Sequence, residues 1–151
     1  MTFTVREATE NDCDEIMRLI KDLAEYEKML DQVSIKAEGN ATAAAQLVGY
    51  VMYYYTYSPW RGRACCMEDI YVEPAWRGKG VGTALWAEVT KSALSMGCSF
   101  VQWVVLDWNK PTIEYYKRQG AEDISEKEGW LLFRMTKPAM TEFVTRKTKQ
   151  S

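Results

Sequence analysis

The chain has no histidine, so any acid–base catalysis must use carboxylates, tyrosines, cysteine thiolates or water. Its cysteines, at positions 13, 65, 66 and 98, form no Cys-x-x-Cys pair, which favours buried thiols in a reducing compartment. It also lacks an apolar run long enough to span a membrane, and its N-terminus shows no signal-peptide pattern. We therefore expect a cytoplasmic protein with no membrane partner and no metal site.

Neither sign of charge dominates the composition. The 19 Lys and Arg residues against 21 Asp and Glu residues give a net charge of −2, and the isoelectric point is near 5.3. This balance argues against nucleic acid as the main partner and is compatible with a cationic substrate. A chain of 151 residues is long enough to bury one core. We predict a single domain over residues 1–144 and a flexible basic tail at 145–151.

The apolar pattern predicts an α/β (α+β) order of elements. Thr9 or Asn11 is expected to cap the first helix, and Asn109 to cap a later helix that ends at Gly120. The other predicted elements are a short strand at 3–5, an antiparallel hairpin of strands 47–57 and 65–72, a helix from residue 81, a strand at 100–106 buried on both faces, and a last strand at 130–135.

Three alternating glycines stand between the second hairpin strand and the following helix, in the segment Arg77–Thr83. Glycine lets the backbone approach a ligand closely, and the start of a helix favours an anion. A purely structural turn would use the same residues. The spacing fits neither a P-loop nor a dinucleotide fingerprint, but it fits Arg-x-x-Gly-x-Gly at Arg77, Gly80 and Gly82.

That hexapeptide resembles the acetyl-CoA pyrophosphate loop of the GNAT superfamily of N-acetyltransferases. The likeness extends to the diamine acetyltransferase branch, nearer to its thialysine-acetylating than to its spermine-acetylating members. It is carried by Tyr57–Trp60, Glu68–Val72, Leu106–Asn109, Tyr116–Arg118 and Glu128–Trp130. The resemblance implies the GNAT fold, a mixed and mostly antiparallel central sheet flanked by helices. It also implies acetyl-CoA as co-substrate, a small amine as acceptor, and an intertwined homodimer.

One segment departs from the resemblance. Members of the superfamily carry a second helix and a further strand between the first helix and the hairpin, but here only residues 35–46 are available. These residues are rich in Ala, Gly and Asn and leave no room for both elements. We expect a shortened connection, which leaves the amine specificity open and the acetyl-CoA half untouched.

The resemblance also assigns roles to individual residues. The expected cofactor-binding residues are Ile70, Tyr71, Val72, Arg77, Gly78, Lys79, Gly80, Val81, Gly82, Thr83, Asn109, Lys110, Pro111, Thr112 and Tyr116. The expected amine-binding residues are Tyr26, Glu27, Glu68, Asp69, Gln102, Trp103, Val104 and Glu128. In isolation, Glu27 and Glu128 read as ordinary surface acids, and the alternative for Glu68 and Asp69 is a solvated hairpin end or an internal ion pair.

An alkyl ammonium, with a pKa near 10.4, must lose a proton before its nitrogen attacks a thioester. Alternation along the strand predicts that Glu68 and Asp69 point to opposite faces and cannot share one role. The resemblance favours Glu68 as the proton acceptor through water. It makes Tyr116 the general acid for the leaving thiolate, although Tyr116 also reads as a core residue.

Together these features predict an acetyl-CoA-dependent N-acetyltransferase acting by direct attack in a ternary complex. The small-amine acceptor could be thialysine, a lysine-like amino acid, a polyamine or a diamine. Protein or peptide lysine acetylation is the alternative within the enzyme class. Outside that class, the shortened segment 35–46 could leave an acetyl-CoA-binding module without turnover, or a scaffold that keeps only a dimer surface.

Overall fold

The computed structural model describes residues 2–34 and 46–148, which fall into two compact units, Met1–Val104 and Val105–Ser151. The expected single domain over 1–144 stays a prediction. The shortened segment 35–46 lies outside the described residues except for its last residue.

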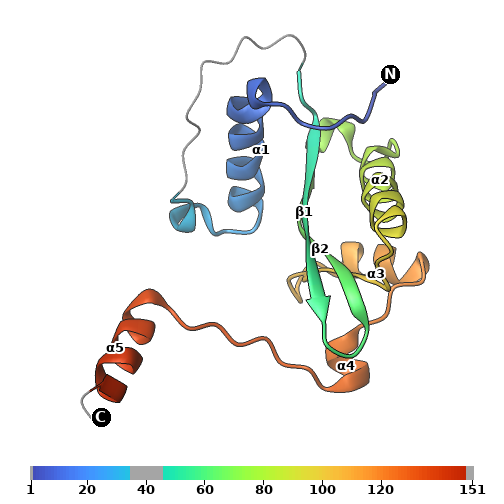
Figure 1. Cartoon of the computed structure of the whole chain (residues 1–151). Helices are drawn as coiled ribbons and strands as arrows, with labels where there is room; N and C mark the ends of the chain where they lie inside the picture. The colour runs from blue at the N-terminus through green and yellow to red at the C-terminus, as the bar shows by residue number, and fades with distance from the viewer. Residues whose placement is uncertain (1, 35–45, 149–151) are drawn as a thin grey trace. The chain divides into compact units, whose positions relative to one another are not determined.

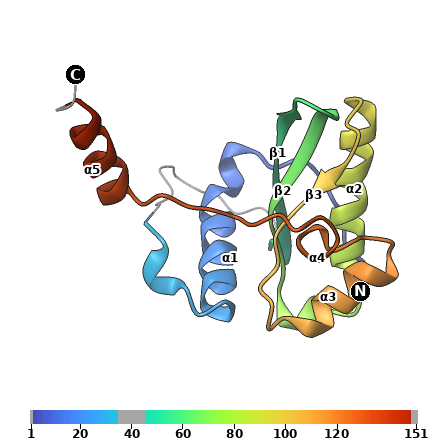
Figure 2. The ribbon, with the colours of Figure 1, turned by 90° about the horizontal axis from the view of Figure 1, so that it is seen from below.

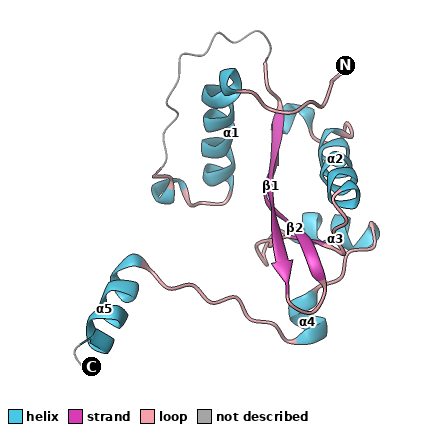
Figure 3. Cartoon of the chain, in the orientation of Figure 1, coloured by secondary structure: helices cyan, strands magenta, loops and turns pink. Residues whose placement is uncertain are grey.

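The first unit is built on a mixed sheet in the order β1-β2-β3. Strands β1 (Gly49–Ser58) and β2 (Gly62–Val72) form the predicted antiparallel hairpin (Figure 3). Strand β3 (Val101–Gln102) runs parallel to β2. The Tyr- and Val-rich composition of β1 suits a pleated surface. Gly62 begins β2 with φ of 79°, a backbone conformation that favours glycine at the hairpin turn.

Two helices cover opposite faces of this hairpin (Figures 1 and 2). Helix α1 (Cys13–Tyr26) buries Leu19 against Tyr50 and Tyr71 on one face. Helix α2 (Val81–Ser95) buries Val89 and Ala93 against Cys65 on the other. The apolar faces of these two helices therefore form the core of the unit.

The cap predicted at Thr9 lies one short turn before α1, because Thr9 precedes η1 (Glu10–Asp12) and Asp12 directly precedes α1. The Thr9 N–H and hydroxyl donate to Oδ2 of Asp12 at 2.8 and 3.0 Å, and η1 leads into α1. Arg6 pairs with the same carboxylate at 2.7 Å. The hydrogen bond to Arg6 and that from the Thr9 N–H hold the pKa of Asp12 well below its usual range. A short helix η2 (Leu30–Gln32) follows α1.

The second unit is helical in its described part. Helix α3 (Lys110–Arg118) begins after Asn109 and is followed by Gly120 with φ of 92°, as predicted. Helix α4 (Ile124–Glu128) was not predicted; the Asp123 carboxylate caps it by accepting from the N–H groups of residues 125 and 126. Helix α5 (Lys137–Thr148) was also not predicted, and it includes the first four residues of the expected flexible tail.

Three strand predictions were wrong or too long. Residues 2–8 and 129–136 form no strand, and only two residues of the predicted strand 100–106 do. That strand is not buried on both faces either, since Val104 is 74% exposed. A strand needs a neighbour for its N–H and C=O groups, and apolar composition alone does not supply one. Within the described chain, no helix has the length and hydropathy needed to cross a membrane.

Candidate functional site

The glycine-rich segment forms an exposed turn that ends at the start of a helix. It follows η3 (Pro74–Trp76), and its residues 77–80 are exposed. Gly78 and Gly80 have φ of 71° and 84°, where a side chain would strain the backbone. Gly80 directly precedes α2, whose first N–H groups lack intrahelical partners and carry the positive end of the helix dipole. This arrangement suits an anion.

Gly82 differs from the other two glycines of the motif. It lies inside the first turn of α2 and does not have a positive φ. A Cβ added there would meet Cγ2 of Val72 at 3.6 Å, an ordinary contact. Neither backbone conformation nor packing therefore requires glycine at this position, although glycine costs helix stability.

Glu68 occupies a β-bulge that the sequence did not reveal. Met52 pairs with Asp69 and Tyr53 with Met67, so Glu68 is left without a partner residue on β1. Bulges redirect side chains and occur next to functional sites. The alternation assumed along this strand is interrupted at this residue.

The bulge brings Glu68 and Asp69 to one face of the sheet. Tyr54 lies on the same face as Met52, which pairs with Asp69. The pKa of Tyr54 is raised to about 12, first by its hydrogen bond with Cys66 and then also by the nearby Glu68 carboxylate. Glu68 also helps to raise the pKa of Asp69. The prediction that the two acids point to opposite faces was therefore wrong.

Glu27 and Asp69 bring like charges together between α1 and β2. Burial and the charge of Asp69 raise the pKa of Glu27. Burial and the charge of Glu68 raise the pKa of Asp69, although the Tyr50 hydroxyl, which donates to its Oδ2 at 3.2 Å, opposes the shift. Carboxylates in such a setting are stabilised by a cation. We call Glu27, Glu68 and Asp69 the acidic cluster.

Arg77, the first residue of the motif, lies against the same part of the unit. Its Cζ is 5.0 Å from the ring centroid of Tyr26 and 5.6 Å from that of Tyr71. Its Nε donates to the Val72 carbonyl at 2.9 Å. Tyr26 ends α1 and directly precedes Glu27. The structure thus brings the predicted amine residues at the end of α1 close to the glycine turn.

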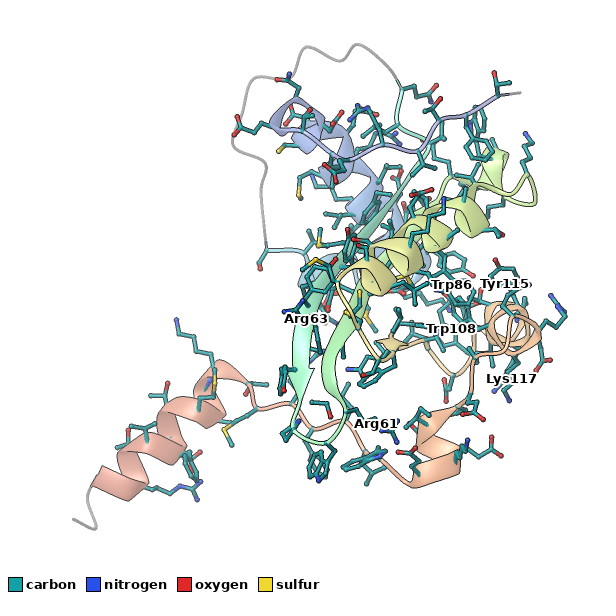
Figure 4. All side chains as sticks on the ribbon, turned by 45° about the vertical axis from the view of Figure 1, so that its right-hand side comes forward. Arg61, Arg63, Trp86, Trp108, Tyr115 and Lys117 are labelled. Carbon is teal, nitrogen blue, oxygen red and sulfur yellow. The ribbon has the colours of Figure 1, made fainter. Side chains whose placement is uncertain are left out.

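The structure does not bring the other predicted amine-binding residues of the first unit into the acidic cluster. Gln102 and Val104 are exposed. Trp103 packs edge-to-face on Trp86 of α2, with ring centroids 5.1 Å apart; Figure 4 labels Trp86. Because α2 covers the face opposite α1, the Trp103 side chain does not join the acidic cluster.

Tyr116 belongs to α3 of the second unit. Burial, together with the neighbouring Tyr115, raises the pKa of Tyr116 to about 12. The two rings are 5.8 Å apart, and Figure 4 labels Tyr115 and Lys117 on this helix. A phenol with this pKa stays protonated at neutral pH, as a proton donor must. The predicted cofactor segment Asn109–Thr112 forms the start of the same helix.

Glu128, the last amine candidate, ends α4 and accepts a hydrogen bond from the Trp130 indole at 2.7 Å. Sequence reasoning missed Tyr50 and Tyr54, which contact the acids. The sequence around these two tyrosines gives little sign of this contact, because the pairing of β1 with β2, not a local motif, places them beside the acids. Among the described residues, no group of three or more Cys, Asp and Glu side chains is arranged to hold a metal ion.

Comparison with known proteins identifies the family. Residues 5–121 match the model of the acetyltransferase (GNAT) family, and the chain belongs to that family. It is 43% identical to a thialysine N-epsilon-acetyltransferase of Bos taurus, over 91% of this chain and 95% of that protein. It is 34% identical to the spermidine/spermine N(1)-acetyltransferase-like protein 1 of Homo sapiens, over 89% of this chain and 23% of that protein.

Solved structures confirm the predicted GNAT fold. An integron cassette protein from the mobile metagenome of V. cholerae superposes with a TM-score of 0.73 at 17% identity, over 92% of this chain and 95% of its own. An aminoglycoside N-acetyltransferase in complex with CoA superposes with a TM-score of 0.64 at 19% identity, over 87% and 98%.

The bovine relative also bears on chain length. Its alignment runs over 161 positions but includes only 91% of this chain of 151 residues, so it carries residues that this chain lacks. A chain shortened at some point agrees with the expectation for residues 35–46, of which 35–45 lie outside the described residues.

Proposed function

We propose that the protein transfers an acetyl group from acetyl-CoA to a primary amine of a small cationic substrate, such as thialysine, a lysine-like amino acid or a polyamine. The observation that carries this proposal is the acidic cluster beside the glycine turn. The pKa values of Glu27 and Asp69 are raised, so a bound ammonium would relieve the unfavourable burial of charge. The names of the relatives support the same substrate class.

The residues present fit acetyl-CoA as co-substrate. Main-chain N–H groups of residues 78–83 would hold the pyrophosphate at the start of α2, where two glycines are needed for the turn and Gly82 leaves room. Arg77 and Lys79 add positive charge to the same turn. The family resemblance assigns the backbone of Ile70–Val72 to the pantetheine arm, and it assigns Asn109–Thr112 and Tyr116 to cofactor binding.

In the proposed reaction, one residue accepts the proton of the amine and another donates a proton to the leaving thiolate. Glu68, exposed at its bulge, receives the ammonium proton through water, and the neutral nitrogen attacks the thioester carbonyl. The new C–N bond forms as the C–S bond breaks. The nitrogen loses its second proton to water as the amide forms, and Tyr116 donates its phenolic proton to the departing thiolate, which yields CoA. The phenolate is then reprotonated from water. Direct attack in a ternary complex needs no covalent enzyme intermediate.

Two further features belong to the proposal. All four cysteines are free, which supports a reducing, cytoplasmic location. A homodimer is proposed from the family resemblance, with substrate-contacting acids contributed across its interface.

The test is a CoA-release assay on the purified chain with thialysine, lysine, spermidine, spermine, putrescine and a lysine-containing peptide. Turnover with at least one small amine is expected. Release with the peptide alone would favour protein acetylation instead. If no substrate gives release, calorimetry distinguishes a chain that binds acetyl-CoA without turnover from one that binds none.

A further inference from the structure

Tyr50 is a buried residue of β1 whose hydroxyl reaches the acidic cluster. It pairs with Tyr71 on β2, and Asp69 lies two positions before Tyr71, on the same face of that strand. Diagonal neighbours of this kind are roughly 7–8 Å apart, within reach of an aromatic side chain. The Tyr50 hydroxyl donates to Oδ2 of Asp69 at 3.2 Å.

Packing fixes the ring of Tyr50. The residue is 7% exposed and packs with Leu19 of α1 and with Tyr71. Phenylalanine would make the same apolar contacts, and a buried hydroxyl costs free energy unless it is hydrogen-bonded. What the hydroxyl adds to this packing is the bond to Asp69.

Ionisable groups from three elements face Asp69: Tyr50 from β1, Glu68 from β2, and Glu27 at the end of α1. Burial and the Glu68 charge raise the pKa of Asp69, whereas the bond from Tyr50 lowers it. Burial and the Asp69 charge raise the pKa of Glu27 in turn. Burial, followed by the Asp69 charge, also holds the pKa of Tyr50 well above its usual range, so the phenol stays a donor. Of these three neighbours, only Tyr50 favours the charged form of Asp69.

We propose that Tyr50 is a positioning residue for the amine: its hydroxyl keeps the Asp69 carboxylate charged and oriented to pair with the substrate ammonium. This role rests on the proposed function, which places the amine at the acidic cluster. Tyr50 acts through Asp69. Its hydroxyl extends amine binding to lower pH, because a protonated Asp69 offers an ammonium no charge.

Tyr50→Phe tests this role, because it keeps the ring and removes only the hydroxyl. Calorimetry on CoA-loaded protein gives the Kd of spermidine and of thialysine from about pH 5 to 8, where their alkyl ammonium groups stay charged. Without the hydroxyl the pKa of Asp69 rises, so affinity is lost earlier as pH falls. We expect the pH of half-loss to move up by about one unit, and the amine Kd on the acidic side to rise about tenfold, the preference that a hydrogen bond to a charged group supplies.

Tyr53→Phe is the matched control, with the same change on the same strand. The Tyr53 hydroxyl donates to Oγ of Ser92 on α2 at 3.2 Å, on the opposite face of the hairpin, so this variant should keep the wild-type amine Kd and pH profile. In an Asp69→Asn background, which retains Glu27 and Glu68, Tyr50→Phe should no longer move the profile.

Carboxyl-carbon NMR titration of the free protein should show the same upward displacement of the Asp69 pKa in Tyr50→Phe. A Tyr50→Phe variant with the wild-type profile would overturn the inference, as would a displacement that persists in the Asp69→Asn background. Circular dichroism melting confirms that every variant is folded.

The Kd measurements also separate this role from the proposed function. A wild-type chain that binds an amine but releases no CoA refutes the function, while the pH profile of Kd still decides the role of Tyr50. A chain that binds neither amine overturns both.

Discussion

Asp69 carries a negative charge in a position that disfavours it. Burial and the Glu68 charge raise its pKa, so the free protein is less stable with the carboxylate than with a neutral group. We predict that Asp69→Asn stabilises the free chain by about 0.5–1 kcal/mol at neutral pH, the usual gain when an unfavourable charge is removed. It should also raise the amine KM about tenfold, because a hydrogen bond to a charged group is lost.

The pH dependence of this difference has a defined sign. The raised pKa means that the folded state favours protonated Asp69. This favourable contribution is fully present below the ordinary carboxyl pKa of about 4, and is lost as pH rises through the raised folded value. The advantage of Asp69→Asn should therefore shrink as pH falls. Urea unfolding across pH measures it, with Glu88→Gln as the control, since Glu88 is exposed and pairs with Lys91 at 2.6 Å. An Asp69→Asn variant less stable than wild type at neutral pH would contradict this reasoning.

Tyr116 offers a second test at the residue scale. We predict that Tyr116→Phe lowers kcat by about 10²- to 10⁴-fold, the usual contribution of a general acid. Because its pKa is about 12, the wild-type rate should show no alkaline loss from Tyr116 below about pH 11. Steady-state rates across pH check both points. Tyr115→Phe is the neighbouring control, and unchanged turnover in Tyr116→Phe would exclude its proposed role.

The glycine turn is tested at the scale of the element. Gly80 and Gly97 flank α2 at its two ends, with φ of 84° and 70°, and a Cβ at either would meet no described atom within 4 Å. Alanine at either position should cost about 1–2 kcal/mol of stability, the cost of the left-handed conformation. Only Gly80→Ala should also weaken acetyl-CoA binding, because only Gly80 lies in the proposed phosphate turn.

Calorimetry with acetyl-CoA and thermal melting of both variants separate the two effects. Equal melting temperatures with a selective loss of affinity in Gly80→Ala support the pyrophosphate assignment. If Gly80→Ala and Gly97→Ala bind acetyl-CoA equally well, the turn serves the fold alone.

Local signals predicted some elements and failed for others. Apolar periodicity predicted the hairpin and helices α1, α2 and α3. Helix start and stop signals such as Thr9 and Gly120 helped, because they act on the backbone within a few residues. The local sequence at 3–5 and 130–135 could not predict whether a strand forms there, because a strand needs a hydrogen-bonded partner strand that the local sequence does not reveal. The bulge at Glu68 depends on the register between two strands, so neither strand shows it alone. Its consequence, an acid pair on one face, was the most important feature missed.

At the scale of the whole molecule, the exposed apolar residues bear on the proposed homodimer. Residues 130–133, Trp-Leu-Leu-Phe, are 61–86% exposed in the described chain. Soluble monomers rarely expose a continuous apolar segment of this kind. A partner copy that covered it would also explain why a sequence of strong strand formers forms no strand here.

We therefore predict that the wild-type chain is a dimer at micromolar concentration and that Leu132→Glu with Phe133→Glu shifts it towards monomer, because burying unpaired charge in an apolar interface is costly. Light scattering coupled to size-exclusion chromatography measures the mass of each. Leu94→Glu is the control, since Leu94 is 71% exposed but lies on α2, and it should remain dimeric. A wild-type monomer would refute the homodimer, whereas a dimer insensitive to the double substitution would place the interface elsewhere.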